Sequence, residues 1–174
     1  MRTIGKRGRR QRGAPPIVGL VCRFIAAWVT GLALLALAPS VERWAIHATI
    51  ASLGIVARVL RVEWTVSGSD VGFAGAHLEI ITDCTPIMPT LALWSAMFAF
   101  PAPLPWKLSG MAAVGGGLWV YNLARVLALA FVLRSRPSWF EFLHVYLWQS
   151  LTLLVVLTMF VCWVKLLRPD EMTS

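Results

Sequence analysis

Long apolar stretches, separated by charged or proline-rich breaks, dominate the hydrophobic pattern of this chain of 174 residues. A helix needs about 20 mostly apolar residues to cross the hydrocarbon core of a bilayer. Four stretches are candidates for such helices, at about 17–38, 86–100, 108–133 and 145–167. The second is the shortest and has prolines at both ends. The pattern therefore predicts an all-α polytopic membrane protein with about four transmembrane helices.

The first apolar stretch follows a basic segment, an order that also occurs in secretory signal peptides. However, the stretch is longer than the apolar region of about 7–15 residues that is typical of a signal peptide. No good cleavage site with a soluble domain behind it follows. We therefore interpret this stretch as a retained span.

The segment 39–85, between the first two spans, is more polar and contains two predicted elements. Its polar positions from 42 to 61 recur at steps of three, four and seven, which places them on one helical face: Arg43, His47, Gly54, Arg58 and Arg61. We favour an amphipathic helix lying in the membrane interface at about 44–60. A fifth span there is the alternative, although two arginines would burden its end. Residues 62–66 and 72–81 alternate around a Ser-Gly-Ser-Asp turn, which predicts a short β-hairpin.

The composition agrees with a membrane protein, because 58% of the residues are hydrophobic and only 14% are charged. Ordinary soluble domains are about 45–50% apolar and about 25% charged, so a soluble fold is excluded. The net charge of +8 is concentrated in an N-terminal arm, 1–16, whose six basic residues are Arg2, Lys6, Arg7, Arg9, Arg10 and Arg12. Without this arm the net charge is about +2, which argues against a nucleic-acid-binding surface.

The arm also predicts the orientation of the chain, because cytoplasmic flanks of membrane spans are enriched in Lys and Arg. With the arm in the cytoplasm, an even number of spans returns the tail at 168–174 to the same side, where Lys107 and Lys165 also lie. Residues 39–85 and the turn at 134–144 then face outward. We expect one transmembrane domain, 17–167, in the inner (cytoplasmic) cell membrane. Arg134 and Arg136, in the outer turn, run against the rule.

Arg125 is an ionisable residue inside the predicted third span. Such a residue costs at least about 2.5–3.5 kcal/mol on insertion scales, which makes it a functional candidate. It lies about 12 Å from the outer end of the span, and Asn122 shares its helical face. A side chain that snorkels to the headgroups is the alternative interpretation. Arg23, near the inner end of the first span, fits that interpretation better.

Cys84 stands at the outer start of the second span, in a polar and proline-bounded stretch. A helix N-terminus and a nearby cation both favour the thiolate form of a cysteine. Cys22 and Cys162 fall in the inner halves of their spans, where a thiol usually fills apolar space. A disulfide between either of them and Cys84 is not expected, because they lie toward the opposite membrane face.

His144 begins the fourth span at its outer end, and His47 and His77 are rival bases on the same side. The predicted topology brings Cys84, Arg125 and His144 to one membrane face at similar depth. A thiolate nucleophile needs a base or proton carrier, and an acyl intermediate needs a positive donor for its developing negative charge. The three residues therefore fit the roles of nucleophile, oxyanion stabiliser and acid or base.

This ordered set resembles the exosortase/archaeosortase family of integral-membrane cysteine transpeptidases over about residues 60–167. The resemblance rests on Cys84-Thr85-Pro86-Ile87 opening one span, Asn122 and Arg125 inside the next, and His144 opening the last. The family usually has Gly where this chain has Pro86, although Pro also suits a first helical turn. Many members carry additional N-terminal spans, so this chain is similar to a minimal core.

The resemblance implies a membrane-anchored protein substrate that ends in a short motif, a transmembrane helix and a basic tail. Cys84 would form a thioester near the motif, and an acceptor would resolve it by transpeptidation. Arg125 would stabilise the oxyanion, while His144 would activate the thiol or protonate the leaving amine. No metal or cofactor is implied, and no Cys/His spacing matches a metal site.

Three further residues are supporting candidates, namely Asn122, Asp83 and Glu141. Glu141 lies three residues before His144 and could orient its imidazole, whereas Asn122 could hold Arg125 or bind the substrate. Two alternatives to the transpeptidase remain: a membrane cysteine peptidase that only hydrolyses, and a non-enzymatic scaffold in which Arg125 pairs with a partner helix. The oligomeric state is open.

Overall fold

The computed structural model describes residues 17–73 and 75–167, so the basic arm and the tail at 168–174 lie outside the described residues. Helices and one small sheet form the described part, which confirms an all-α polytopic membrane protein with a small β element. The elements are α1 (Ile17–Leu37), α2 (Pro39–Leu60), β1 (Trp64–Ser67), β2 (Asp70–Phe73), β3 (Ala76–Glu79), η1 (Thr82–Cys84), α3 (Ile87–Ala99), α4 (Leu104–Ser135), η2 (Pro137–Trp139), α5 (Phe140–Phe142), the π-helical turn η3 (Leu143–Leu147) and α6 (Trp148–Leu166).

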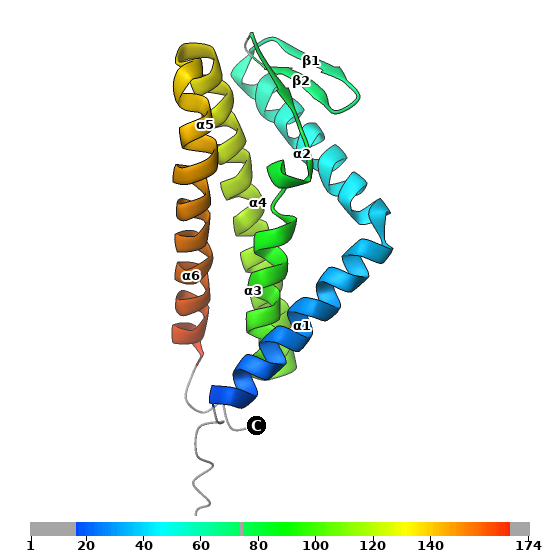
Figure 1. Cartoon of the computed structure of the whole chain (residues 1–174), viewed down its shortest axis with the longest axis vertical. Coiled ribbons are helices and arrows are strands. Elements are labelled where there is room, and N and C mark those ends of the chain that lie inside the picture. Colours follow the sequence, from blue (N-terminus) through cyan, green and yellow to red (C-terminus); the bar gives the residue numbers. More distant parts are fainter. Residues whose placement is uncertain (1–16, 74, 168–174) are drawn as a thin grey trace, which may run out of the picture.

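The arrangement of the elements separates the molecule into two ends (Figure 1). The start of α1, the connection from α3 to α4 and the end of α6 lie at one end. The sheet and the connection from α4 to α5 lie at the other. The connections at these two ends are the ones that the positive-inside rule separates in the sequence, except that α2, part of the segment 39–85 expected outside, runs from the bend toward the sheet end.

Helices α1 and α2 form a bent pair rather than a compact hairpin (Figure 1). The bend lies at Ala38 and Pro39, where Pro39 supplies the first residue of α2 and has no N–H for continuing α1. Helix α1 packs against α3, while α2 continues toward the sheet. Together, α1 and α2 therefore run once along the long axis of the molecule.

The predicted spans are matched with two differences. Helix α3 has only 13 residues, because Pro101 and Pro103 follow its end, so it is shorter than the span expected at 86–100. Helix α2 has 22 residues and is long and apolar enough to cross a membrane, although the sequence pattern predicts a helix in the interface. The four helical segments of that length and composition are α1, α2, α4 and residues 137–166.

The predicted hairpin has a third strand. Strands β1 and β2 pair antiparallel with Val66 opposite Val71, and β3 adds to β2 with Leu78 opposite Val71. The second strand of the predicted hairpin is divided because the chain turns again at Gly75, which has a φ of 84°. Left-handed backbone of this kind is easily adopted by glycine.

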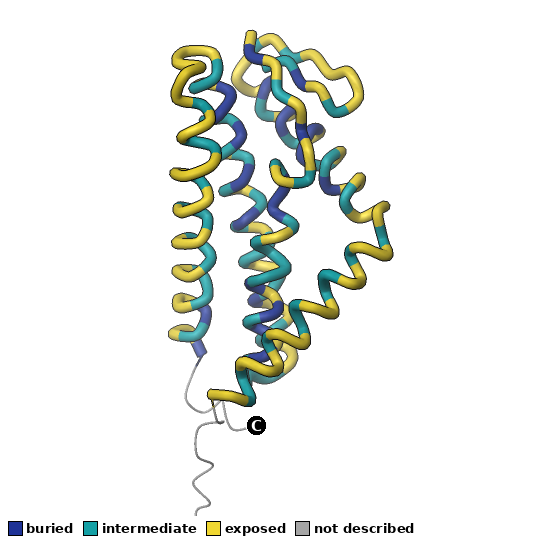
Figure 2. Tube along the Cα trace, viewed as in Figure 1, coloured by how far each residue is buried: buried dark blue, intermediate teal, exposed yellow. Residues whose placement is uncertain are grey.

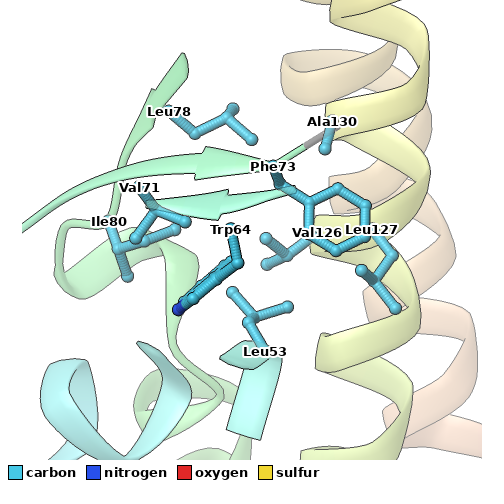
Figure 3. Close-up of a pocket in the computed structure, with 9 residues that line it drawn as sticks. All are labelled: Leu53, Trp64, Val71, Phe73, Leu78, Ile80, Val126, Leu127 and Ala130. Atoms are coloured by element: carbon cyan, nitrogen blue, oxygen red, sulfur yellow. The ribbon is translucent and has the colours of Figure 1, made fainter. Parts of the chain in front are cut away.

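The sheet packs onto α2 and α4 through apolar side chains (Figure 3). A cavity of about 10 Å³ remains between them, about the space of one water molecule. Its lining is apolar and comprises Leu53, Trp64, Val71, Phe73, Leu78, Ile80, Val126, Leu127 and Ala130. The contact between sheet and helices is therefore a core and not a binding cavity.

Burial is concentrated in α2, α3 and α4, whereas α1 and α6 carry long exposed stretches (Figure 2). Only 6% of the most apolar window of α1 and of residues 137–166 is buried. Exposed leucines and valines on these helices suit contact with lipid, where they need no protein cover. The protein's own core accordingly lies along α4.

Candidate active site

Cys84 ends η1, a single 3₁₀ turn that joins β3 to α3. The Cys84 N–H donates to the carbonyl of Ile81 at 2.9 Å, which closes this turn. The hydroxyl of Thr85 donates to the carbonyl of Thr82 at 2.6 Å, and Thr85 is buried. These bonds hold the half-buried Cys84 beside the start of α3.

Pro86 fits this turn without strain. It caps α3 with a φ of −84° and a ψ of 13°, and its carbonyl accepts the N–H of Thr90 at 3.0 Å. Glycine would be required only for left-handed backbone, and φ here is negative. Proline at position 86 is therefore compatible with the backbone beside Cys84.

Asn122 links α4 to the Cys84 turn. Its side-chain amide donates to the carbonyl of Cys84 at 2.7 Å, and the residue is only 3% exposed. Leu118 and Val126, one turn away on either side, are also buried and are apolar. A buried amide in such a row is destabilising unless it is hydrogen-bonded, and this bond satisfies it.

Arg125 reaches the same turn from three residues further along α4. Its Nη1 donates to the carbonyl of Asp83 at 3.3 Å, which is long for an N–H···O bond. Its Nε is buried and has no partner among the described residues. Because the acceptor is a main-chain carbonyl, the bond does not neutralise the guanidinium. Arg125 thus keeps its charge and an unused donor beside Cys84.

His144 lies in the π-helical turn η3, at the top of the α5–α6 segment. It is half-buried, and its ring stacks on Phe140 with centroids 5.5 Å apart and an interplanar angle of 29°. The charges of Arg125 and Asp83 both act on the imidazole. A π-helical turn in an α-helix is frequently found at a functional site.

The thiol itself does not contact the imidazole. Cys84 Sγ is directed toward the carbonyl of Glu79 at 3.9 Å, and no hydrogen bond joins it to a histidine within residues 17–73 and 75–167. His47, on α2, and His77, on β3, are exposed. Catalytic hydrogen bonds are often completed only when substrate is bound, so the assignment of His144 as the base stays a prediction.

The other residues predicted from the sequence fall into two groups, those that belong to the site and those that do not. Asp83 is exposed and belongs to the site through its carbonyl and its charge. Glu141 is exposed one turn before His144, whose ring stacks on Phe140 instead. Cys22 and Cys162 are free and exposed on α1 and α6, so they are surface thiols of apolar helices rather than core fillers.

The sequence interpretation gives no role to two neighbours of the site: Thr85, whose hydroxyl closes the turn, and Phe140, on which His144 stacks. Both have a local signal. Thr82 and Thr85 are three residues apart, and Phe140 and His144 are four apart, which are the spacings of side chains that meet on a helical turn. Among the described residues, no group of three or more His, Cys, Asp or Glu is placed to hold a metal ion.

Comparison of the chain with protein-family models, with curated proteins and with solved structures finds no match. Any function must therefore be inferred from the arrangement of the site.

Proposed function

We propose that this chain is an exosortase-like membrane cysteine transpeptidase that cleaves a C-terminal sorting signal from exported proteins. The observation that carries the proposal is the pair of bonds from one turn of α4 to the nucleophile's own turn. Asn122 bonds to the carbonyl of Cys84, and Arg125 bonds to the carbonyl of Asp83. A buried amide and an intramembrane guanidinium that converge on a cysteine are rare without a functional reason.

The chemistry follows from these positions. The Cys84 thiolate attacks the scissile carbonyl, a C–S bond forms, and the carbonyl oxygen becomes an oxyanion beside Arg125. The long bond from Arg125 to Asp83 is easily exchanged for this oxyanion, and its unpartnered Nε is a further donor. Collapse expels the amine, which takes its proton from the imidazolium of His144.

The resulting thioester joins the substrate's new C-terminus to Cys84. An acceptor amine then attacks the thioester carbonyl and loses its proton to His144. The C–S bond breaks and the thiolate is regenerated, so the enzyme returns to its starting state. Asn122 acts as a positioning residue, since its amide is already used by the Cys84 carbonyl.

The depth of the site suits a substrate held in the membrane. Arg125 lies ten residues, about 15 Å, before the end of α4 on the side of the sheet. With the basic arm in the cytoplasm, this end faces outward from the inner membrane. A sorting signal's helix would approach from lipid and present its motif near Cys84.

The test uses cells in which variants of the chain replace the natural one. An exported protein of the same genome that ends in a short motif, a transmembrane helix and a basic tail serves as substrate. We expect loss of the tail with the natural chain and with Cys162→Ala, and no loss with Cys84→Ala. Unchanged processing by Cys84→Ala would remove the enzymatic proposal.

The mass of the processed product separates transfer from hydrolysis. An added group at the new C-terminus supports the transpeptidase. A free carboxylate would replace it with a hydrolytic peptidase that uses the same residues.

A further inference from the structure

Two arginines at the outer end of α4 are not used by the proposed active site. Arg134 lies in the last turn of α4, and Arg136 follows the end of the helix; both are exposed. A cation in a last turn is stabilised by the helix dipole, which accounts for Arg134. It does not account for Arg136, and both residues run against the charge rule for outer turns.

A surface cavity of about 200 Å³ is lined in part by Arg136, the second of these arginines. Its lining comes from the end of α4, from η2 and from the start of η3: Phe131, Val132, Ser135, Arg136, Trp139 and Leu143. Arg136 is the charged member of this lining, and four of the others are large apolar side chains. The cavity thus combines an apolar wall with a cationic rim.

The surroundings of the cavity match the depth of lipid headgroups. Phe131 is 70% exposed and Trp139 is 53% exposed, and Trp139 packs edge-on against Phe142. Tryptophan is enriched where the hydrocarbon core meets the headgroups. An occupant of this cavity would therefore have an apolar part beside Phe131 and an anionic part beside Arg136.

We infer that this cavity binds an anionic phospholipid of the outer leaflet. The phosphate and the negatively charged headgroup lie against Arg136 and Arg134, and the upper part of an acyl chain lies against Phe131, Trp139 and Leu143. Leu143 opens the π-helical turn that contains His144, so a bound lipid would also brace that turn. This inference concerns binding and does not depend on the proposed reaction.

The experiment measures the thermal unfolding midpoint of the purified full chain in a neutral detergent. Dioctanoyl phosphatidylglycerol is titrated against dioctanoyl phosphatidylcholine and against inorganic phosphate. We expect a saturable rise with phosphatidylglycerol and no comparable rise with the other two. Equal effects of the zwitterionic lipid would overturn charge recognition, and equal effects of free phosphate would show an anion site without a lipid.

Matched variants locate the binding site. Arg134→Gln/Arg136→Gln should weaken the phosphatidylglycerol effect at least about tenfold, because each arginine near an anionic lipid contributes to its affinity. Arg43→Gln/Arg58→Gln removes two exposed arginines of α2 and should leave the affinity unchanged. Equal losses in both double variants, or full binding by the first, would contradict the inference.

A third variant tests the apolar wall. Ser135→Trp keeps both arginines and fills space in the cavity lining, so we expect it to weaken binding of the lipid as well. Undiminished binding by Ser135→Trp would show that the arginines bind charge without the cavity, and would overturn this assignment.

Discussion

Helix α4 joins two cores that differ in construction. The lower core lies where α3, α4 and α6 pack together, and its buried members are Leu93, Met97, Leu118, Trp163 and Leu167. The upper core lies between α2, the sheet and α4, and its buried members are Ile50, Leu53, Val71, Ile80 and Val126. Cys84 packs against the upper core, and Asn122 lies on α4 between Leu118 and Val126.

The lower core is built for close packing. Phe100 packs edge-on against Trp163, and Phe160 packs against it at a tilt. The Trp163 ring lies directly against Gly110 of α4. The upper core instead joins a helix to a small sheet and a 3₁₀ turn, which must position a cysteine. The polar side chains of Asn122 and Arg125 are tolerated at the boundary of the two cores because both donate hydrogen bonds to main-chain carbonyls of that turn. We therefore expect stability to be concentrated below Asn122, and the proposed chemistry to take place just above it.

Replacement of His144 is expected to have the largest effect on processing, and it tests this division between the two cores. General acid–base groups contribute about 10²–10⁴-fold to rate, so His144→Ala should reduce processing by that factor while the thermal unfolding midpoint changes little. His77→Ala, an exposed change on β3, should leave processing near normal. If His77→Ala is inactive and His144→Ala is active, the sheet and not η3 supplies the base. Processing is measured as tail loss per unit of inserted protein.

Arg125→Met removes the charge but keeps a long side chain at the boundary. Loss of one oxyanion donor typically lowers kcat about 10²–10³-fold, and we expect a loss of this size. The unfolding midpoint should stay unchanged or rise, because the bilayer penalty for the charge disappears. Arg43→Met, an exposed change on α2, serves as the control and should process normally. A large fall in stability with Arg125→Met would assign Arg125 a structural role instead.

Gly110→Val should damage the lower core. An added Cβ would overlap the Trp163 ring and Met97, and overpacking of this kind costs about 1–3 kcal/mol. We expect a lower unfolding midpoint in detergent and a reduced yield of monodisperse protein. Gly116→Val, on the same helix, adds its Cβ to open space and should leave both near normal. Equal effects of the two changes would show that the cost comes from the helix backbone and not from the core.

Asn122→Leu places an apolar side chain of similar size between the two cores. The fold should be retained, because the apolar row of α4 becomes continuous. The Cys84 carbonyl loses its partner, and the lost bond of about 1.4 kcal/mol corresponds to about a tenfold fall in kcat/KM. Asn122→Gln, which keeps the amide, should recover part of this loss. Full activity of Asn122→Leu would show that the bond does not position the nucleophile.

The sequence predicts much of the fold, because spans of apolar residues are set by the thickness of the bilayer. The positions of α1, α4 and α6 follow from this rule. It does not predict that α1 and α2 form one bent pair, because a proline that ends one helix does not fix the direction of the next helix. The third strand also escapes prediction, because the turn at Gly75 interrupts what reads as one alternating run.

The candidate site is predicted in part for a similar reason. The predicted topology alone places Cys84, Arg125 and His144 toward one face, since each is predicted at the same end of the membrane domain. The bond from Asn122 to the Cys84 carbonyl joins residues 38 positions apart, which no local spacing reveals. The π-helical turn at His144 likewise depends on how the α5–α6 segment packs, and its sequence alone reads as ordinary helix.

The central claim is that Cys84 carries the acyl intermediate. Membranes containing the natural chain are incubated with the tail-bearing substrate, quenched in acid and digested, and thioester adducts are located by mass spectrometry. We predict a hydroxylamine-sensitive adduct on the peptide that contains Cys84, and none on the peptides that contain Cys22 or Cys162. Substrate processing that continues in Cys84→Ala, or an adduct confined to another cysteine, would contradict the account.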